Sequence, residues 1–142
     1  MNAIEQQIQA LEELQKPQNI NPILLTVHQQ VKRRIHDQGR AANNSQIGTY
    51  SEGYLKTRRK KGLGGSRKVI LELTGQMRRD FVPIKQGRYI IGSGFNNRLN
   101  LQKSKWVERT YRKVIYALTR KESNLLTELL QNKADKLTDA SS

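Results

Sequence analysis

The feature that most limits the fold is a stretch of about thirty residues, 39–68, in which neither a helical nor a strand period is sustained. Its glycines and polar residues are typical of a loop or arm, and long loops in compact domains are usually functional or disordered. The core must therefore come from the segments on either side. With 142 residues, of which 35% are hydrophobic, the chain suits one modest domain with a thin core.

Positive charge is concentrated in and just before this stretch. The protein has a formal net charge of +14, from 26 Lys and Arg against 12 Asp and Glu. Residues 32–68 hold eleven basic side chains against two acidic ones and so carry +9 of this charge. Such a field is expected to attract a polyanion, an acidic protein surface or a neighbouring subunit. The alternative is a loop whose charges are simply solvated.

The strongest electrostatic signal is the basic run that follows two tyrosines. Tyr50 and Tyr54 either stack on nucleic-acid bases or anchor the arm to the domain. Cations on an arm neutralise the phosphates of a nucleic acid. The residues predicted to contact DNA in a channel, or another polyanion, are Lys56, Arg58, Arg59, Lys60, Lys61, Arg67 and Lys68.

Two helices are predicted before the arm. The first has apolar residues on one face and ends before Pro17; these residues are Ile4, Ile8, Leu11 and Leu14. After a linker over 17–21, Asn21 caps a second helix that begins at Pro22 and stops at Gly39. Its buried face is predicted to consist of Leu24, Val27, Val31 and Ile35. The cations in its last turn, which complement the helix dipole, are Lys32, Arg33 and Arg34.

A small antiparallel sheet is predicted after the arm. Residues 69–73 alternate like a strand, and Thr74 can cap a helical turn over 76–80. Two further strands, 81–85 and 88–92, are joined by a hairpin turn at Gln86-Gly87, and Pro83 favours an edge position. Gly92 and Gly94 are expected to flank a bend, with Phe95 in a third strand.

The C-terminal part is predicted to be mainly helical. Residues 100–112 form a helix around Trp106, and 114–118 leave it to run extended. Thr119 and Glu122 have the spacing of a capping box before the last helix, whose apolar residues are Leu125, Leu126, Leu129 and Leu130. The predicted fold class is α+β, a small antiparallel sheet flanked by N-terminal and C-terminal helices. It comprises a helix and linker (1–20), one domain (21–133) with a long basic arm (40–68), and a polar, fraying tail (134–142).

Catalysis is not required by any pattern in the sequence, and we predict neither an enzyme nor a cofactor or metal. The chain has no cysteine, which excludes thiolate chemistry, and only His28 and His36 offer imidazole. Glu72 and Asp80 either hold a divalent cation, as in a nuclease, or pair with arginines at 78, 79 or 88. No apolar run approaches the roughly 18 residues needed to cross a bilayer.

The order of the segments resembles a known family. Residues 70–81, ILELTGQMRRDF, are similar to the strand, Thr-Gly and short-helix motif of tailed-bacteriophage virion morphogenesis and tail-completion proteins. Residues 47–51 followed by Tyr54 and a basic stretch are similar to the variable arm before that motif. Residues 88–92 and 112–119 resemble the family's later strand and the approach to its final helix. The match covers roughly 35–130, and it depends on the order and spacing of motifs that are weak alone.

This resemblance implies a structural virion protein of the neck, head–tail junction or tail-completion region, assembled in the host cytoplasm as a homo-oligomeric ring. The implied partners are connector, portal or tail proteins and the double-stranded DNA in the channel. Residues assigned to structure or assembly are Thr74, Gly75, Met77, Tyr50, Tyr54 and Trp106. The alternative is a free nucleic-acid-binding protein that acts through the basic arm, 56–68. A ring subunit is expected to be oligomeric without DNA, whereas a free binder is expected to be monomeric.

Overall fold

The fold combines helices with one small sheet, as predicted. A computed structural model of the chain describes residues 2–62, 69 and 76–141. Within these residues lie six helices and two strands, in the order α1 (Ala3–Leu14), α2 (Pro17–His36), α3 (Glu52–Lys60), α4 (Gln76–Asp80), β1 (Phe81–Gln86), β2 (Tyr89–Phe95), α5 (Arg98–Tyr111) and α6 (Arg120–Ser141). The two strands form an antiparallel hairpin, and helices precede and follow it. The α+β fold class is therefore confirmed.

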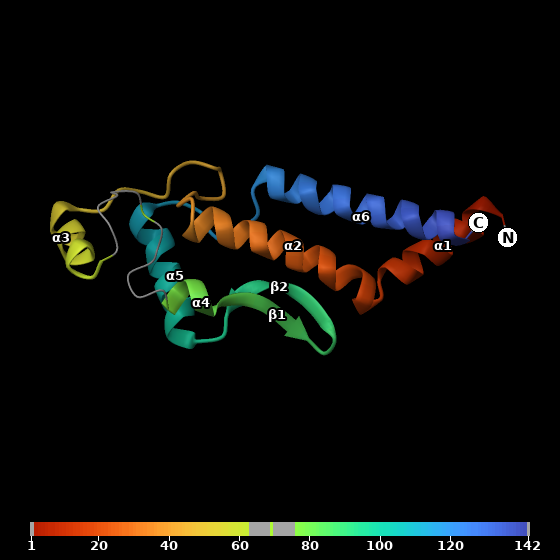
Figure 1. The fold of residues 1–142 in the computed structure, drawn as a ribbon, viewed down its shortest axis with the longest axis horizontal. Coiled ribbons are helices and arrows are strands. Elements are labelled where there is room, and N and C mark those ends of the chain that lie inside the picture. The colour runs from red at the N-terminus through yellow and green to blue at the C-terminus, as the bar shows by residue number, and fades with distance from the viewer. Residues whose placement is uncertain (1, 63–68, 70–75, 142) are drawn as a thin grey trace.

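The molecule is elongated, and its two ends differ in construction (Figure 1). Helices α2 and α6 pack side by side along the long axis, and the hairpin packs against α2. At one end, α1 packs against the C-terminal part of α6, and the two chain termini lie together there. At the other end lie α3 and α5. The buried hydrophobic residues gather toward this second end, where α2, the hairpin and the connecting segments meet.

The second helix begins earlier than its sequence predicts. The helix α1 is confirmed, but the predicted linker at 17–21 is wrong because α2 starts at Pro17, directly after its N-cap residue Lys16. Proline is tolerated at a first helical position since that amide has no intrahelical partner. Pro22 lies inside α2. Asn21 does not cap the helix; its side-chain oxygen accepts a hydrogen bond from the Ile90 amide at 3.0 Å and so ties α2 to β2.

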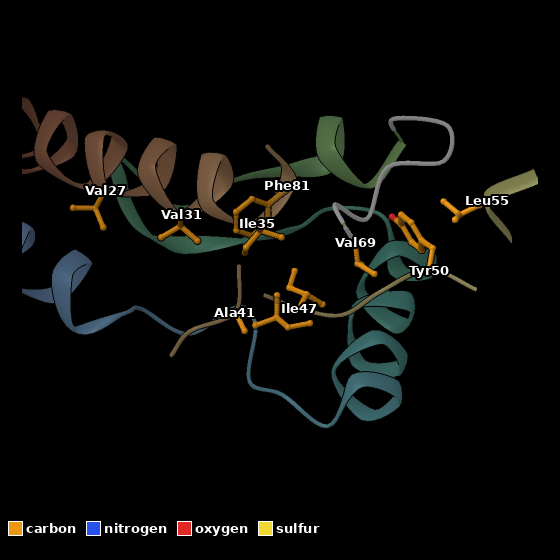
Figure 2. Packing of buried hydrophobic residues seen from close by; sticks show 10 residues of the cluster. Val27, Val31, Ile35, Ala41, Ile47, Tyr50, Leu55, Val69 and Phe81 are labelled. Atoms are coloured by element: carbon orange, nitrogen blue, oxygen red, sulfur yellow. The ribbon is translucent and has the colours of Figure 1, made fainter. Parts of the chain in front are cut away.

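The core is built from one face of α2 and from segments that are distant in sequence. Figure 2 shows Val27, Val31 and Ile35 in a row along α2, with the ring of Phe81 beside Ile35. The core cluster consists of Val27, Val31, Ile35, Ala41, Ile47, Tyr50, Leu55, Val69, Phe81 and Ile115. The predicted buried face of this helix is thus confirmed at three positions, whereas Leu24 is only partly buried.

The predicted arm is partly helical. Ser51 caps α3, and its hydroxyl accepts a hydrogen bond from the Tyr54 amide at 3.2 Å. Leu55 is buried and fixes α3 to the core cluster. The expectation of a continuous loop over 40–68 is therefore wrong for Glu52–Lys60, because one buried leucine and a cap are enough to hold a short helix there.

The hairpin confirms the turn at Gln86-Gly87 and changes the end of its second strand. Gly87 has a φ of 59°, the left-handed conformation that a glycine adopts without strain. No bend occurs at Gly92-Ser93-Gly94; β2 continues through these residues to Phe95, which pairs with Phe81. The predicted strand at 69–73 lies outside the described residues except for Val69, which is buried.

The C-terminal segments are confirmed up to the end of the last helix. Residues 114–118 leave α5, as predicted, although they are not assigned to a strand. The capping box at the start of α6 is present, because the Thr119 amide donates to Glu122 and the Glu122 amide donates to the Thr119 hydroxyl, at 2.9 and 3.0 Å. The predicted fraying after Lys133 is wrong. Helix α6 continues to Ser141, because α1 packs against it.

Candidate polyanion-binding surface

Helix α3 presents most of the predicted phosphate contacts to solvent. Among the seven predicted cations, those exposed on α3 and its C-cap are Lys56, Arg59, Lys60 and Lys61. They lie within two turns of helix, so their fields add at the end of the molecule farthest from α1 (Figure 1). Arg67 and Lys68 lie outside the described residues.

Arg58 does not belong to this exposed group. Its side chain is buried, and its guanidinium carbon lies 4.7 Å from the centre of the Tyr50 ring. Tyr50 is itself buried and packs against Tyr54, with ring centres 4.9 Å apart. The two tyrosines therefore anchor α3 to the domain, which is one of the two predicted roles. Arg58 stabilises this anchor through a cation–π contact, and because its side chain is buried it does not add to the exposed cations of α3.

The other residues assigned to assembly are not gathered at this surface. Trp106 is 48% exposed on α5, which is unusual for the only tryptophan of a chain with a thin core. Met77 is partly buried on α4. Thr74 and Gly75 lie outside the described residues, so their assignment to structure or assembly stays a prediction.

The sequence does not predict the extensive hydrogen bonding of Arg34. Arg34 is 4% exposed, and its Nε donates to an Oε atom of Glu122 at 2.8 Å. Its Nη atoms donate to the backbone carbonyls of Arg40, Ile115 and Ala117, at 2.9 to 3.0 Å. Arg34 therefore joins α2, the loop after it, the 114–118 segment and the cap of α6. Its role is structural, although the basic cluster in which it lies predicts only a helix-dipole contact.

An open groove of about 1160 Å³ borders this buried pair. It lies between the C-terminal half of α2, the loop at 40–44 and the first turns of α6. Its lining includes the basic residues Arg34, Arg40, Arg120 and Lys121, and also the acids Glu122 and Glu128. Because both signs are present and Arg34 is already bonded to Glu122, the groove does not add to the cationic surface of α3.

The carboxylate of Asp80 is hydrogen-bonded to residues at the start of α5. Its carboxylate accepts hydrogen bonds from the Asn97 amide at 2.9 Å and from the Asn100 side-chain amide at 3.1 Å, at the start of α5. Glu72, the other acid of the nuclease alternative, lies outside the described residues. Within the described part of the chain, no three His, Cys, Asp or Glu residues gather as a metal site would require. Of the predicted arginine partners, Arg78 pairs with Asp37, at 2.7 Å.

Both histidines lie in the core near Phe81. The ring centres of His28 and His36 lie 5.2 and 5.9 Å from the centre of the Phe81 ring. A ring nitrogen of His28 is 2.7 Å from the hydroxyl of Ser93 on β2. Burial, and then the positive charge of Lys32, lower the pKa of His28 below 6.5. His28 therefore belongs to the packing between α2 and the hairpin.

Comparison with known proteins adds no relative. No family model matches the chain, and neither a curated protein nor a solved structure matches it significantly. The resemblance of residues 70–81 to phage virion proteins therefore stays a prediction. Among the described helices, none is long and apolar enough to cross a membrane.

Proposed function

We propose that the chain is a structural virion protein of a tailed bacteriophage, which forms part of a ring at the neck, head–tail junction or tail-completion position. Its partners are further copies of itself, the neighbouring connector, portal or tail proteins and the DNA in the channel. Assembly takes place in the host cytoplasm, and the protein remains in the virion. The resemblance of its ordered motifs to tail-completion proteins suggests this role, and one surface property carries the proposal.

That property is an excess of surface. The chain exposes 9336 Å², about 1800 Å² more than the roughly 7500 Å² expected for a folded monomer of 16.4 kDa. Part of this surface is apolar: the exposed large hydrophobic residues are Ile4, Ile8, Leu11, Leu25, Tyr89, Ile91, Leu99, Leu101, Trp106, Val114 and Leu118. A subunit whose neighbours complete its packing has such a surface, whereas a monomeric domain buries more of it.

The ring proposal is tested on the full-length protein without nucleic acid. Sedimentation velocity and negative-stain electron microscopy are expected to show closed particles of several subunits. Detection of the chain in purified virions by mass spectrometry would place the ring in the particle. A protein that stays monomeric across the accessible concentration range and is missing from virions would contradict the proposal.

A second candidate, a free nucleic-acid-binding protein, is favoured by the four exposed cations of α3 and its cap. If each cation neutralises one phosphate, log affinity for duplex DNA falls with log salt at a slope of about −3.6, and with Arg67 and Lys68 at about −5. Replacing Lys60 and Lys61 by Ala is expected to reduce the slope by about 2. Binding by a monomer, without sequence preference, supports this candidate over the ring. A slope near zero removes DNA as the partner of α3.

A further inference from the structure

The outer face of α1 is apolar and has no partner among the described residues. Ile4, Ile8 and Leu11 are 68%, 52% and 52% exposed. Their spacings of four and three residues place them in one stripe along the helix. The opposite side of α1 is the one that packs inward, since Ala10 is its buried residue and α6 is its main neighbour. The stripe therefore faces away from the subunit.

Acidic side chains border this stripe. The charged residues of α1 are Glu5, Glu12 and Glu13, and it contains neither Lys nor Arg, in a chain of net charge +14. Glu5 and Glu12 are seven residues apart and therefore share one side of the helix. Each follows an exposed apolar residue, Ile4 or Leu11, by one position. The outer face of α1 is thus an apolar stripe with an acidic row along one edge.

Helix α5 presents the complementary pattern. Leu99 and Trp106 are 52% and 48% exposed and, at seven residues apart, form a second apolar stripe. A row of exposed cations, Arg98, Lys105 and Arg109, runs along one edge of it. Arg98 and Lys105 each precede an exposed apolar residue by one position. The inner side of α5 is the one that carries the buried Asn100 and Ser104.

These two stripes lie toward opposite ends of the elongated subunit, so they cannot cover each other within one chain (Figure 1). We propose that α1 of one subunit docks on α5 of the next, head to tail, through these stripes. The inference rests on the proposed ring, and it identifies the surfaces that close it. A head-to-tail contact of this kind generates a ring whenever its rotation closes.

The positions of the charges also define the direction of the helices. The acids follow their apolar residues by one position, whereas the cations precede theirs. When two such helices face each other in parallel, both charged rows lie on the same side of the contact, and Glu5 and Glu12 meet Arg98 and Lys105. An antiparallel alignment places the rows on opposite sides. In the parallel register, Ile4 lies near Leu99 and Leu11 near Trp106.

Self-association of either helix is unfavourable by comparison. In an antiparallel pair of α1 helices the two acidic rows lie on the same side of the contact, as do the two basic rows in an antiparallel pair of α5 helices, and like charges across an interface are repulsive. A parallel pair of either helix places its two charged rows on opposite sides, so neither pairing brings opposite charges together. The area also fits a head-to-tail contact. In a ring, each subunit contributes two half-interfaces, so the area it buries equals one complete interface. The surface excess of about 1800 Å² lies within the 1,200–2,000 Å² of a standard interface.

The absence of cysteine makes a cross-linking test direct. A full-length chain with Leu11→Cys is mixed with one carrying Trp106→Cys, and disulfide formation is followed under mild oxidation. We expect a covalent dimer between the two chains. The matched control is Leu99→Cys, which lies on the same stripe but about 10 Å along the helix, and it is expected to react poorly with position 11. Leu118→Cys is an exposed control on another segment.

The outcomes separate this inference from the proposed ring. Efficient disulfide formation between positions 11 and 99, or between two copies of position 11, overturns the parallel contact between α1 and α5. The absence of any disulfide overturns it as well. Rings seen by microscopy without an 11-to-106 link leave the proposed function intact and remove only the inference. A strong 11-to-106 link in open chains supports the inference and contradicts the closed ring.

Charge reversal provides a second readout that does not depend on cysteine. Glu5→Lys with Glu12→Lys is expected to weaken association by at least about tenfold, and Arg98→Glu with Lys105→Glu by a similar factor. The four changes combined in one chain are expected to restore association. Glu128→Lys, an exposed acid on α6, is the control and is expected to have no effect. Failure of the combined variant to recover, with its fold intact by circular dichroism, would also overturn the pairing.

Discussion

The two ends of α6 lie in contrasting environments. At its first turn, Glu122 is buried and bonded to Arg34 and Thr119, next to the hydrophobic core. Beyond Glu122, none of the residues up to Ala140 is buried, and α1, its main neighbour there, buries only Ala10. One end is therefore held by a polar network and a core, and the other by a thin contact between two helices.

This difference shows how a small domain can separate stability from association. A buried ion pair with complete hydrogen bonding is sensitive to the loss of either partner. An exposed helix face adds little to the stability of the free subunit and is available for a neighbour. We therefore expect substitutions at the Arg34 end to affect unfolding, and substitutions on the outer face of α1 to affect assembly.

The largest effect is expected for Arg34→Met. This change removes the cation and leaves Glu122 charged and buried without its main partner, which costs about 3–5 kcal/mol of unfolding free energy. Arg33→Met is the matched control, because Arg33 is exposed in the same turn, and its effect is expected to stay within about 0.5 kcal/mol. Urea unfolding of both variants measures the difference. Equal losses would show that the network does not stabilise this end.

A second test concerns the close approach between the segment before α3 and α5. A Cβ atom at Gly48 would lie 2.6 Å from Cε1 of Tyr111, so Gly48→Ala is expected to cost about 1–3 kcal/mol through overpacking. Gly53→Ala is the control. A Cβ there meets nothing within 4 Å inside α3, and alanine is expected to stabilise the helix by about 0.5–1 kcal/mol. Thermal melting should therefore shift in opposite directions, and a common direction would contradict this packing.

The sequence predicts local features of both ends and misses the long-range ones. The capping box at Thr119 and Glu122 and the hairpin turn at Gly87 are set by residues close together in sequence, so their spacing identifies them. The role of Arg34 is not predictable in this way, since the carbonyls of Ile115 and Ala117 reach it only after the 114–118 segment has packed on α2.

The same reasoning explains why the predictions for α2 and α3 are wrong. Two prolines five residues apart suggest a linker, yet Pro17 is accommodated at the start of α2. The side chain of Asn21 does not cap the helix, because it accepts a hydrogen bond from the backbone of β2. In α3, the sequence shows a run of cations but not which one turns inward. Arg58 does so because Tyr50 is buried beneath it, a contact that depends on the tertiary fold.

A smaller effect is expected from pH at the contact between α2 and the hairpin. Burial and Lys32 lower the pKa of His28 in the folded state, so below about pH 6.5 the unfolded chain takes up this proton first. Stability is therefore present above pH 6.5, falls as the pH drops below it, and levels off below the folded pKa. His28→Gln, which does not titrate, should show a smaller loss of melting temperature between about pH 7.5 and 5.5. An unchanged slope would contradict this assignment.

The smallest effect on stability is expected on the outer face of α1, from Ile8→Ala. The side chain of Ile8 is 52% exposed, and alanine is the better helix former, so at concentrations where the protein is monomeric its unfolding free energy should change by no more than about 0.5 kcal/mol. The same truncation in the core, Ile35→Ala, should cost about 2–5 kcal/mol. Sedimentation should show the opposite order for assembly, with Ile8→Ala weakening association. If Ile8→Ala instead destabilises the monomer as Ile35→Ala does, the outer face of α1 is packed within its own subunit, and the division between a stabilising end and an associating end fails.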